Sequence, residues 1–172
     1  MSRSSRSRGS HVFLTAVIGT VVFLAWAPAA VAQDVEDGQR IWKEKAGCPL
    51  CHGWADDGLA SGFHNQGGLP LRKTQLTRDQ IRMTIRCGRP GTVMPHFDRF
   101  AYTDKRCYGM TEKDLGNQVP DRAPTTLQVF EIDAVADYVA TKVKGAGPVT
   151  RAQCVAFFGA QADAECAKYP ER

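Results

Sequence analysis

Three residues with reactive side chains lie within one short segment, Cys48-Pro-Leu-Cys51-His52. The two thiols are about one helical turn apart, so both can add to the vinyl groups of a single porphyrin. His52 follows directly, and its imidazole can bind the porphyrin iron from one face. This C-x-x-C-H motif predicts one covalently attached haem c, held by Cys48 and Cys51, with His52 as an iron ligand.

Two other kinds of site use a C-x-x-C pair. A thioredoxin-like redox site follows a strand in an alternating strand and helix pattern, and no such pattern precedes Cys48. A structural zinc site needs a second close pair of Cys or His ligands, which the sequence does not contain. Both alternatives are therefore less consistent with the sequence than a haem.

The ligand on the other face of the iron decides between electron transfer and catalysis. The candidates are Met83, Met94, Met110, His64 and His96. Met94 lies in a loop and is followed by Pro95. In this it resembles the distal methionine of the class I cytochromes c, and on that resemblance we favour it. His96 and Met110 remain alternatives, and so does an open site. A His/Met pair fills both axial positions, and its soft thioether favours ferrous iron.

Four further cysteines are available for disulfides. Cys87 and Cys107 bracket the Met94 loop, and Cys154 and Cys166 lie close together near the C-terminus. We expect these two pairs, although four cysteines allow three pairings and the sequence does not choose among them. A bond between Cys87 and Cys107 would clamp the loop that carries Met94.

Three amphipathic segments are predicted to form the helices that position these groups. The first spans 34–46, with Asp34 as its N-cap, and leads into the motif. The second spans 77–87, where Thr77 and Gln80 form a capping box. The third spans 127–144 and ends at Gly145, with an apolar face made by Phe130, Ile132, Val135, Val139 and Val143.

The first helix, with Gly38 and Trp42 four residues apart, leads directly into C-x-x-C-H, and in this it resembles the class I cytochromes c. The resemblance covers mainly residues 35–53, the Met94 loop and 127–144. It implies an all-α fold in which N- and C-terminal helices cross around one haem, here with a loop insertion and a disulfide-tied C-terminal extension. Trp54 and Tyr102 are expected to pack near the haem.

A narrower resemblance concerns an extra-cysteine group of cytochromes linked to methanol metabolism. The residues that carry it are Gly47 to Trp54, the segments Cys87-Gly-Arg-Pro-Gly and Met94-Pro-His-Phe-Asp, and Arg106-Cys-Tyr-Gly. It implies a quinoprotein alcohol or methanol dehydrogenase as the electron donor.

The N-terminus has the order of an export signal: Arg3, Arg6 and Arg8, then an apolar run, then Ala30-Val31-Ala32. We expect cleavage after residue 32, a cytochrome domain over 33–146 and an extension over 147–172. The mature chain would be periplasmic, with no membrane anchor.

Charge is unevenly distributed along the 172 residues. The segment 72–106 holds nine basic residues against three aspartates. Because the expected export argues against a nucleic-acid partner, we interpret this segment as a docking surface for an acidic redox protein, with a solvated helix face as the alternative.

Three functions follow from these features. The favoured one is a carrier of single electrons from a periplasmic dehydrogenase toward a terminal oxidase or another cytochrome, and not an enzyme. The second is a haem subunit fixed to one dehydrogenase. The third is a haem enzyme with an open site for a peroxide or sulfur compound, with His64 or His96 as acid or base.

Overall fold

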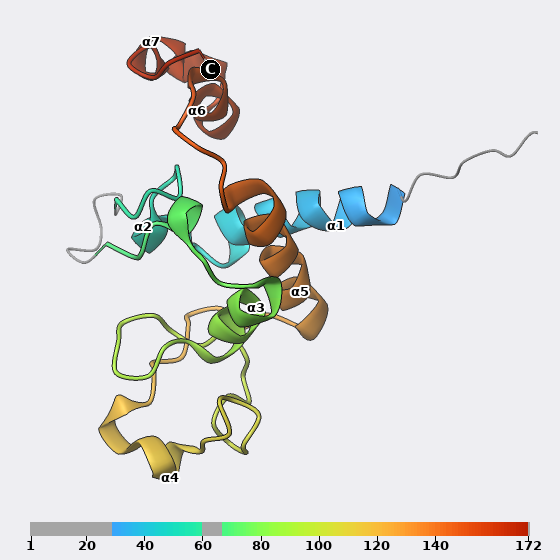
Figure 1. Ribbon diagram of the computed structural model, residues 1–172, viewed down its shortest axis with the longest axis vertical. Coiled ribbons are helices and arrows are strands. Elements are labelled where there is room, and N and C mark those ends of the chain that lie inside the picture. Colours follow the sequence, from blue (N-terminus) through green and yellow to red (C-terminus); the bar gives the residue numbers. More distant parts are fainter. Residues whose placement is uncertain (1–28, 60–66, 172) are drawn as a thin grey trace, which may run out of the picture.

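The computed structural model describes residues 29–59 and 67–171. Within these ranges the chain is all-helical, and its only bridges are the isolated pairs His96–Arg122 and Cys107–Met110. The α-helices are α1 (Ala29–Arg40), α2 (Pro49–His52), α3 (Arg78–Cys87), α4 (Glu112–Leu115), α5 (Val129–Tyr138), α6 (Arg151–Phe158) and α7 (Asp163–Cys166). Figure 1 shows α1, α3 and α5 in the middle of the molecule, with α4 at one end and α6 and α7 at the other.

The crossing of α1 and α5 forms the centre of the fold. Gly38 permits the close approach, since a Cβ there would lie 2.7 Å from the carbonyl carbon of Ala134. One turn later the rings of Trp42 and Tyr138 pack with their centroids 5.9 Å apart. Both helices continue past their α-helical parts as wider π-type turns, Ile41–Lys45 and Val139–Val143. The expected crossing of N- and C-terminal helices is therefore confirmed.

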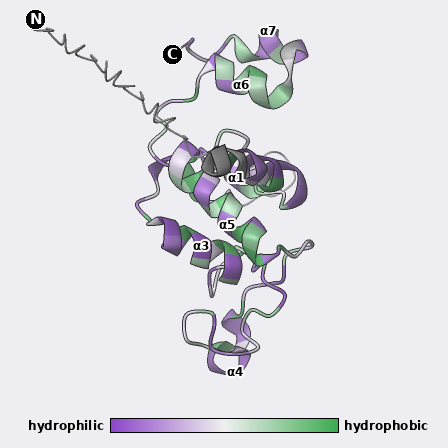
Figure 2. Ribbon diagram, turned by 90° about the vertical axis from the view of Figure 1, so that its right-hand side faces the viewer, coloured by the Kyte–Doolittle hydropathy of each residue, from purple (hydrophilic) through white to green (hydrophobic). Residues whose placement is uncertain are grey.

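Helix α3 packs on α5 and forms as its sequence predicts. The Thr77 side chain accepts from the Gln80 backbone N–H, and the Gln80 side chain accepts from the Thr77 N–H, so the capping box is complete. Ile81 and Ile85 are buried in the main core. Beside this apolar contact, Arg78 and Arg82 of α3 pair with Asp137 and Asp133 of α5. Figure 2 shows both polar and apolar residues on the two helices.

A second, smaller core lies under the long connection between α3 and α5. It consists of Cys87, Cys107, Ala101 and Tyr102. The predicted disulfide between Cys87 and Cys107 is present, and the buried Tyr102 hydroxyl donates to the Cys87 carbonyl at 2.7 Å. This core anchors the connection beside the loop that contains Met94.

The C-terminal extension is tied together by the second predicted disulfide, Cys154–Cys166, and α6 begins at the expected capping box of Thr150 and Gln153. Its aromatic side chains enclose Trp54, whose ring centroid lies 5.2 to 5.7 Å from those of Phe157, Phe158 and Tyr169. The extension thus docks on the segment that follows the C-x-x-C-H motif.

Two local predictions are wrong. Asp34 is not an N-cap, because α1 begins at Ala29 and the small residues before Asp34, good helix formers, continue the helix. Phe130 is 70% exposed, since it lies one residue into α5 and faces away from the core that buries Ile132 and Val135. Residues 1–28 of the expected export leader lie outside the described part of the chain. Among the described helices, none is long and apolar enough to span a membrane.

Candidate functional site

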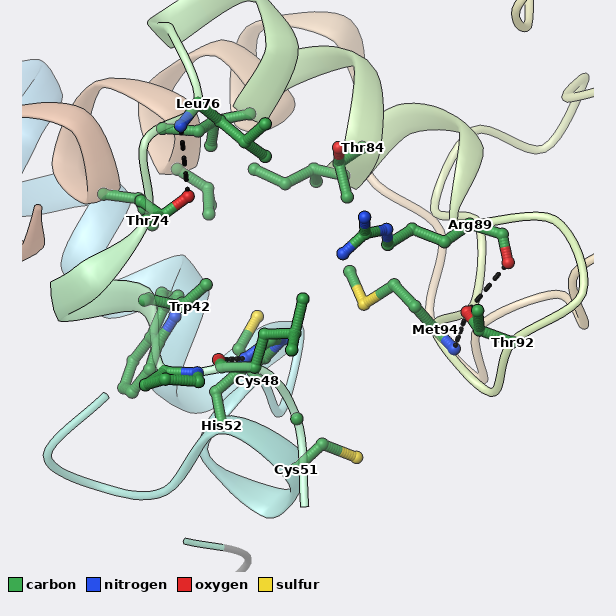
Figure 3. Close-up of a pocket in the computed structure, with 18 of the residues that line it drawn as sticks. Trp42, Cys48, Cys51, His52, Thr74, Leu76, Thr84, Arg89, Thr92 and Met94 are labelled. Carbon is green, nitrogen blue, oxygen red and sulfur yellow. Dashed lines mark hydrogen bonds between the residues drawn. The ribbon is translucent and has the colours of Figure 1, made fainter. Parts of the chain in front are cut away.

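One cavity of about 710 Å³ collects most of the residues singled out by the sequence. Its walls come from α2, the segment 67–76, α3, the Met94 loop and α5, and they are mostly apolar. Cys48, Cys51, His52 and Met94 all line it (Figure 3). A volume of this size and an apolar lining suit a large, flat organic cofactor.

Helix α2 presents the two thiols and the imidazole together. The His52 backbone N–H donates to the Cys48 carbonyl at 2.9 Å, so both residues lie on one helical turn. The flanking glycines 47 and 53 have φ values of 66° and 77°, which let the chain turn sharply into and out of this short helix. Cys48 and Cys51 are free, half-buried thiols.

The His52 ring is oriented by the segment that follows. Its Nδ1 lies 2.9 Å from the Leu69 carbonyl. Gly68 lets the chain pass directly over the ring, because a Cβ there would stand 2.7 Å from Nδ1. Burial lowers the pKa of His52, although the Leu69 carbonyl opposes this. A proton on Nδ1, donated to the Leu69 carbonyl, would leave the Nε2 lone pair free for a metal.

Met94 reaches the cavity from the other side. Its carbonyl accepts from the Arg89 N–H at 3.2 Å, and its own N–H donates to the Thr92 hydroxyl at 3.2 Å. Gly88, at a φ of 65°, lies so close that a Cβ would meet the Met94 carbonyl oxygen at 2.6 Å. Figure 3 shows the Met94 thioether pointing into the space between this loop and α2.

The other candidate ligands lie elsewhere. His96 is buried against Tyr102, and its Nδ1 lies 2.9 Å from the Asp98 carbonyl. Met83 packs on the second core, and Met110 pairs with Cys107 outside the cavity. His64 lies outside the described residues. Of the candidates within the described part, only Met94 lines the cavity.

The expectation that Trp54 and Tyr102 pack near the haem is wrong. Neither lines the cavity: Trp54 packs on the C-terminal extension, and Tyr102 belongs to the second core. Trp54 lies next to the motif in sequence, but Gly53 between them has a positive φ and turns the chain away from the cavity.

The residues present fit a haem. Two thiols and an imidazole lie on one side of an apolar cavity and a thioether on the other, and Gly68 leaves the imidazole the room it needs. The lining includes the cations Lys73 and Arg89 but no carboxylate among the described residues, which suits a cofactor that carries carboxylates. No three His, Cys, Asp or Glu side chains gather for a metal ion in the described ranges, so the zinc alternative gains no support.

Fewer basic side chains of the segment 72–106 are available to a partner protein than its sequence indicates. Carboxylates hold four of its nine basic residues: Arg78, Arg82, Arg86 and Arg106. Arg72 instead donates to the carbonyls of Ala55, Gly147 and Pro148, and so ties the extension to the motif segment. The expected docking surface is therefore reduced to a few unpaired cations.

Sequence reasoning missed Gly68, Leu69 and Arg72 as supporting residues. The Gly67-Gly68-Leu69-Pro70 run after the motif was a signal for a close backbone approach. Arg72 gave no signal, because its partners are backbone carbonyls far away in sequence.

The segment that carries the motif and Met94 matches a known family. The family model of cytochrome c oxidase, cbb3-type, subunit III matches residues 33–112. Among solved structures, oxidized cytochrome c6(A) from Arabidopsis thaliana is similar with a TM-score of 0.44 and 19% identity, over 68% of this chain and 97% of that one. No curated protein matches the chain. The matched segment contains both C-x-x-C-H and Met94, which supports one covalently bound haem c.

Proposed function

We propose that this chain is a periplasmic monohaem c-type cytochrome that carries single electrons, with Cys48 and Cys51 as the attachment residues and His52 and Met94 as the axial ligands. The observation that carries the proposal is the placement of His52 and Met94 on opposite sides of one apolar cavity, with the two thiols beside His52. A haem bound there would supply the one-electron couple.

The chain's own residues adapt the site to electron transfer. The Leu69 carbonyl orients the His52 ring by accepting from Nδ1, so that Nε2 is left to bind the iron. Gly88 and Thr92 hold the Met94 backbone, which keeps a weak thioether ligand within reach. Apolar walls made by Ile81, Ile85 and Val135 exclude water.

If His52 and Met94 both bind the iron, they would leave no open position for a substrate, as expected of a carrier rather than a haem enzyme. We infer an export leader that is cleaved after residue 32. The donor would be a periplasmic dehydrogenase, in the methanol-linked case a quinoprotein, and the acceptor a terminal oxidase or another cytochrome.

One observation favours the alternative of a haem subunit fixed to one dehydrogenase. The C-terminal extension forms its own disulfide-tied helix pair, and Phe158 remains 53% exposed on it although it packs on Trp54. Copurification of the mature chain with a dehydrogenase in equal amounts would support this alternative, whereas a chain that purifies alone supports the carrier.

The test of the proposed function is an absorption spectrum of the mature holoprotein. We expect the spectrum of a low-spin c-type haem, with the weak ferric band of an iron–methionine bond, and we expect that band to vanish in Met94→Ala. Met110→Ala is the matched control and should keep it. A high-spin ferric spectrum in the unaltered protein, changed by added peroxide, would contradict the carrier and favour the enzyme.

A further inference from the structure

Arg89 is held at the wall of the cavity by the same loop that holds Met94. Its N–H donates to the Met94 carbonyl, and its carbonyl accepts from the Thr92 N–H at 3.1 Å and the Thr92 hydroxyl at 2.8 Å. Gly88 permits the close packing of these segments. The backbone of Arg89 is therefore fixed relative to Met94.

The Arg89 side chain extends from this loop into the cavity. Figure 3 shows its guanidinium between Thr84 and the Met94 thioether, pointing toward the side formed by Trp42 and Cys48. Most of the surrounding wall is apolar, with Ile85 and Phe97 among its members. Arg89 as a whole is exposed, so its guanidinium lies at the solvent-facing rim of the cavity, where it can meet the polar edge of a bound group.

The protein supplies no such partner to Arg89 among its described residues. Other arginines of the same stretch each have a carboxylate close by, as Arg86 has Asp98 at 2.8 Å and Arg78 has Asp137 at 2.9 Å. Around Arg89 the cavity lining contains no Asp or Glu. A carboxylate that pairs with Arg89 inside the cavity would therefore come from the group that occupies it.

We propose that Arg89 pairs with a carboxylate group of the bound haem and thereby stabilises the ferrous state. This inference rests on the proposed function, since the haem is the only source of the carboxylate. Guanidinium and carboxylate form two parallel hydrogen bonds, so the pair also fixes the position of the haem relative to the Met94 loop.

The expected direction of the effect follows from charge. A cation held near the haem disfavours the additional positive charge of ferric iron, and it keeps the carboxylate ionised. Without Arg89, ferric iron is no longer disfavoured by a nearby cation, so the midpoint potential falls. The carboxylate then also binds a proton more readily, so the midpoint potential depends more strongly on pH.

The experiment is a redox titration of the holoprotein as a function of pH. In Arg89→Gln we expect the ferrous to ferric ratio at fixed potential to fall about tenfold, equivalent to about 59 mV for one electron, with a steeper pH dependence. Arg89→Lys keeps the charge and should recover most of the shift. Arg99→Gln removes an arginine outside the cavity and should leave both properties unchanged.

Three outcomes would overturn the proposal. Arg89→Gln with an unchanged potential and pH profile excludes the pair. Equal shifts in Arg89→Gln and Arg99→Gln mean a general effect of net charge. If the midpoint potential shifts in Lys73→Gln and not in Arg89→Gln, the haem carboxylate pairs with Lys73 instead. Failure of the proposed function would appear differently, as the absence of a c-type haem spectrum in the unaltered protein.

Discussion

Gly38 and Ala134 are in direct contact where α1 crosses α5, and Gly38 is the residue whose missing side chain allows it. A Cβ at position 38 would also lie 2.9 Å from the Cβ of Tyr138, so any larger residue has to push the two helices apart. The two helices carry the core residues Trp42 and Val135, which also line the cavity. The first prediction concerns this contact.

Gly38→Val should lower the free energy of unfolding by about 1 to 3 kcal/mol, because overpacking at a helix crossing forces a backbone shift. Urea unfolding followed by circular dichroism measures the change. Gln39→Val places the same side chain on the exposed neighbouring position and should cost less than about 1 kcal/mol. Equal losses in the two variants would mean that the crossing tolerates a side chain.

The disulfide between Cys87 and Cys107 closes a 20-residue separation around Met94. Replacing both cysteines by Ser should lower the free energy of unfolding by about 3 kcal/mol. We also expect the iron–methionine band to disappear at a lower temperature than in the unaltered protein, because the clamp on the Met94 loop is lost. A thermal melt recorded at that band measures this.

The matched control is the double replacement of Cys154 and Cys166, which removes the disulfide of the extension. It should leave the melting of the iron–methionine band unchanged. If both double variants shifted the band by the same amount, the Cys87–Cys107 bond would have no special role at the ligand loop.

Much of the fold was predictable because its signals are local. Helix α3 follows from the capping box and from the spacing of Ile81 and Ile85, which is enough to specify a short amphipathic helix. The attachment motif is likewise a contiguous pattern. Gly38 was also recognisable, since it stands one turn before Trp42.

What sequence reasoning missed depends on contacts between distant segments. Asp34 has the right residue type for an N-cap, yet helix-forming residues precede it and extend α1. The partners of the arginines in 72–106 come mostly from α5 and from aspartates 98 and 104, so the pairing appears only in three dimensions. The contacts of Gly68 and Leu69 with the His52 ring likewise become visible only in the folded chain.

Asp56 provides a prediction about pH. Its side chain is buried with one oxygen lacking a hydrogen-bond partner, and burial raises the pKa of Asp56 to about 7 although Arg72 opposes the rise. An unfolded Asp has a pKa of about 3.9. Between these values the folded chain binds the proton more tightly than the unfolded chain, so stability falls as pH rises from about 4 to about 7.

Asp56→Asn removes this titration. Denaturant unfolding at a series of pH values should show the unaltered protein losing stability relative to the variant as pH rises through that range. A difference between the two proteins that stays constant with pH would contradict the assignment of the proton to Asp56.

Arg72 provides a prediction about the C-terminal extension. Besides the backbone carbonyls, its guanidinium donates to the Gln153 side chain at 3.0 Å. Arg72→Gln should release the extension, so that amide hydrogen exchange becomes faster over residues 149–171. Lys73→Gln, one position along, is the control and should leave this exchange unchanged. Slow exchange in Arg72→Gln would show that the aromatic packing on Trp54 holds the extension by itself.

The pairing of the arginines in 72–106 has a consequence for how this protein meets others. Opposite charges about 3 Å apart, as in Arg86–Asp98, largely cancel at a distance. At physiological ionic strength the screening length is about 8 Å, so a molecule farther away senses little of this segment beyond Arg72, Lys73, Arg99 and Lys105. Recognition therefore begins at contact, through shape and local hydrogen bonding, and the rate of encounter should slow only modestly when salt is added.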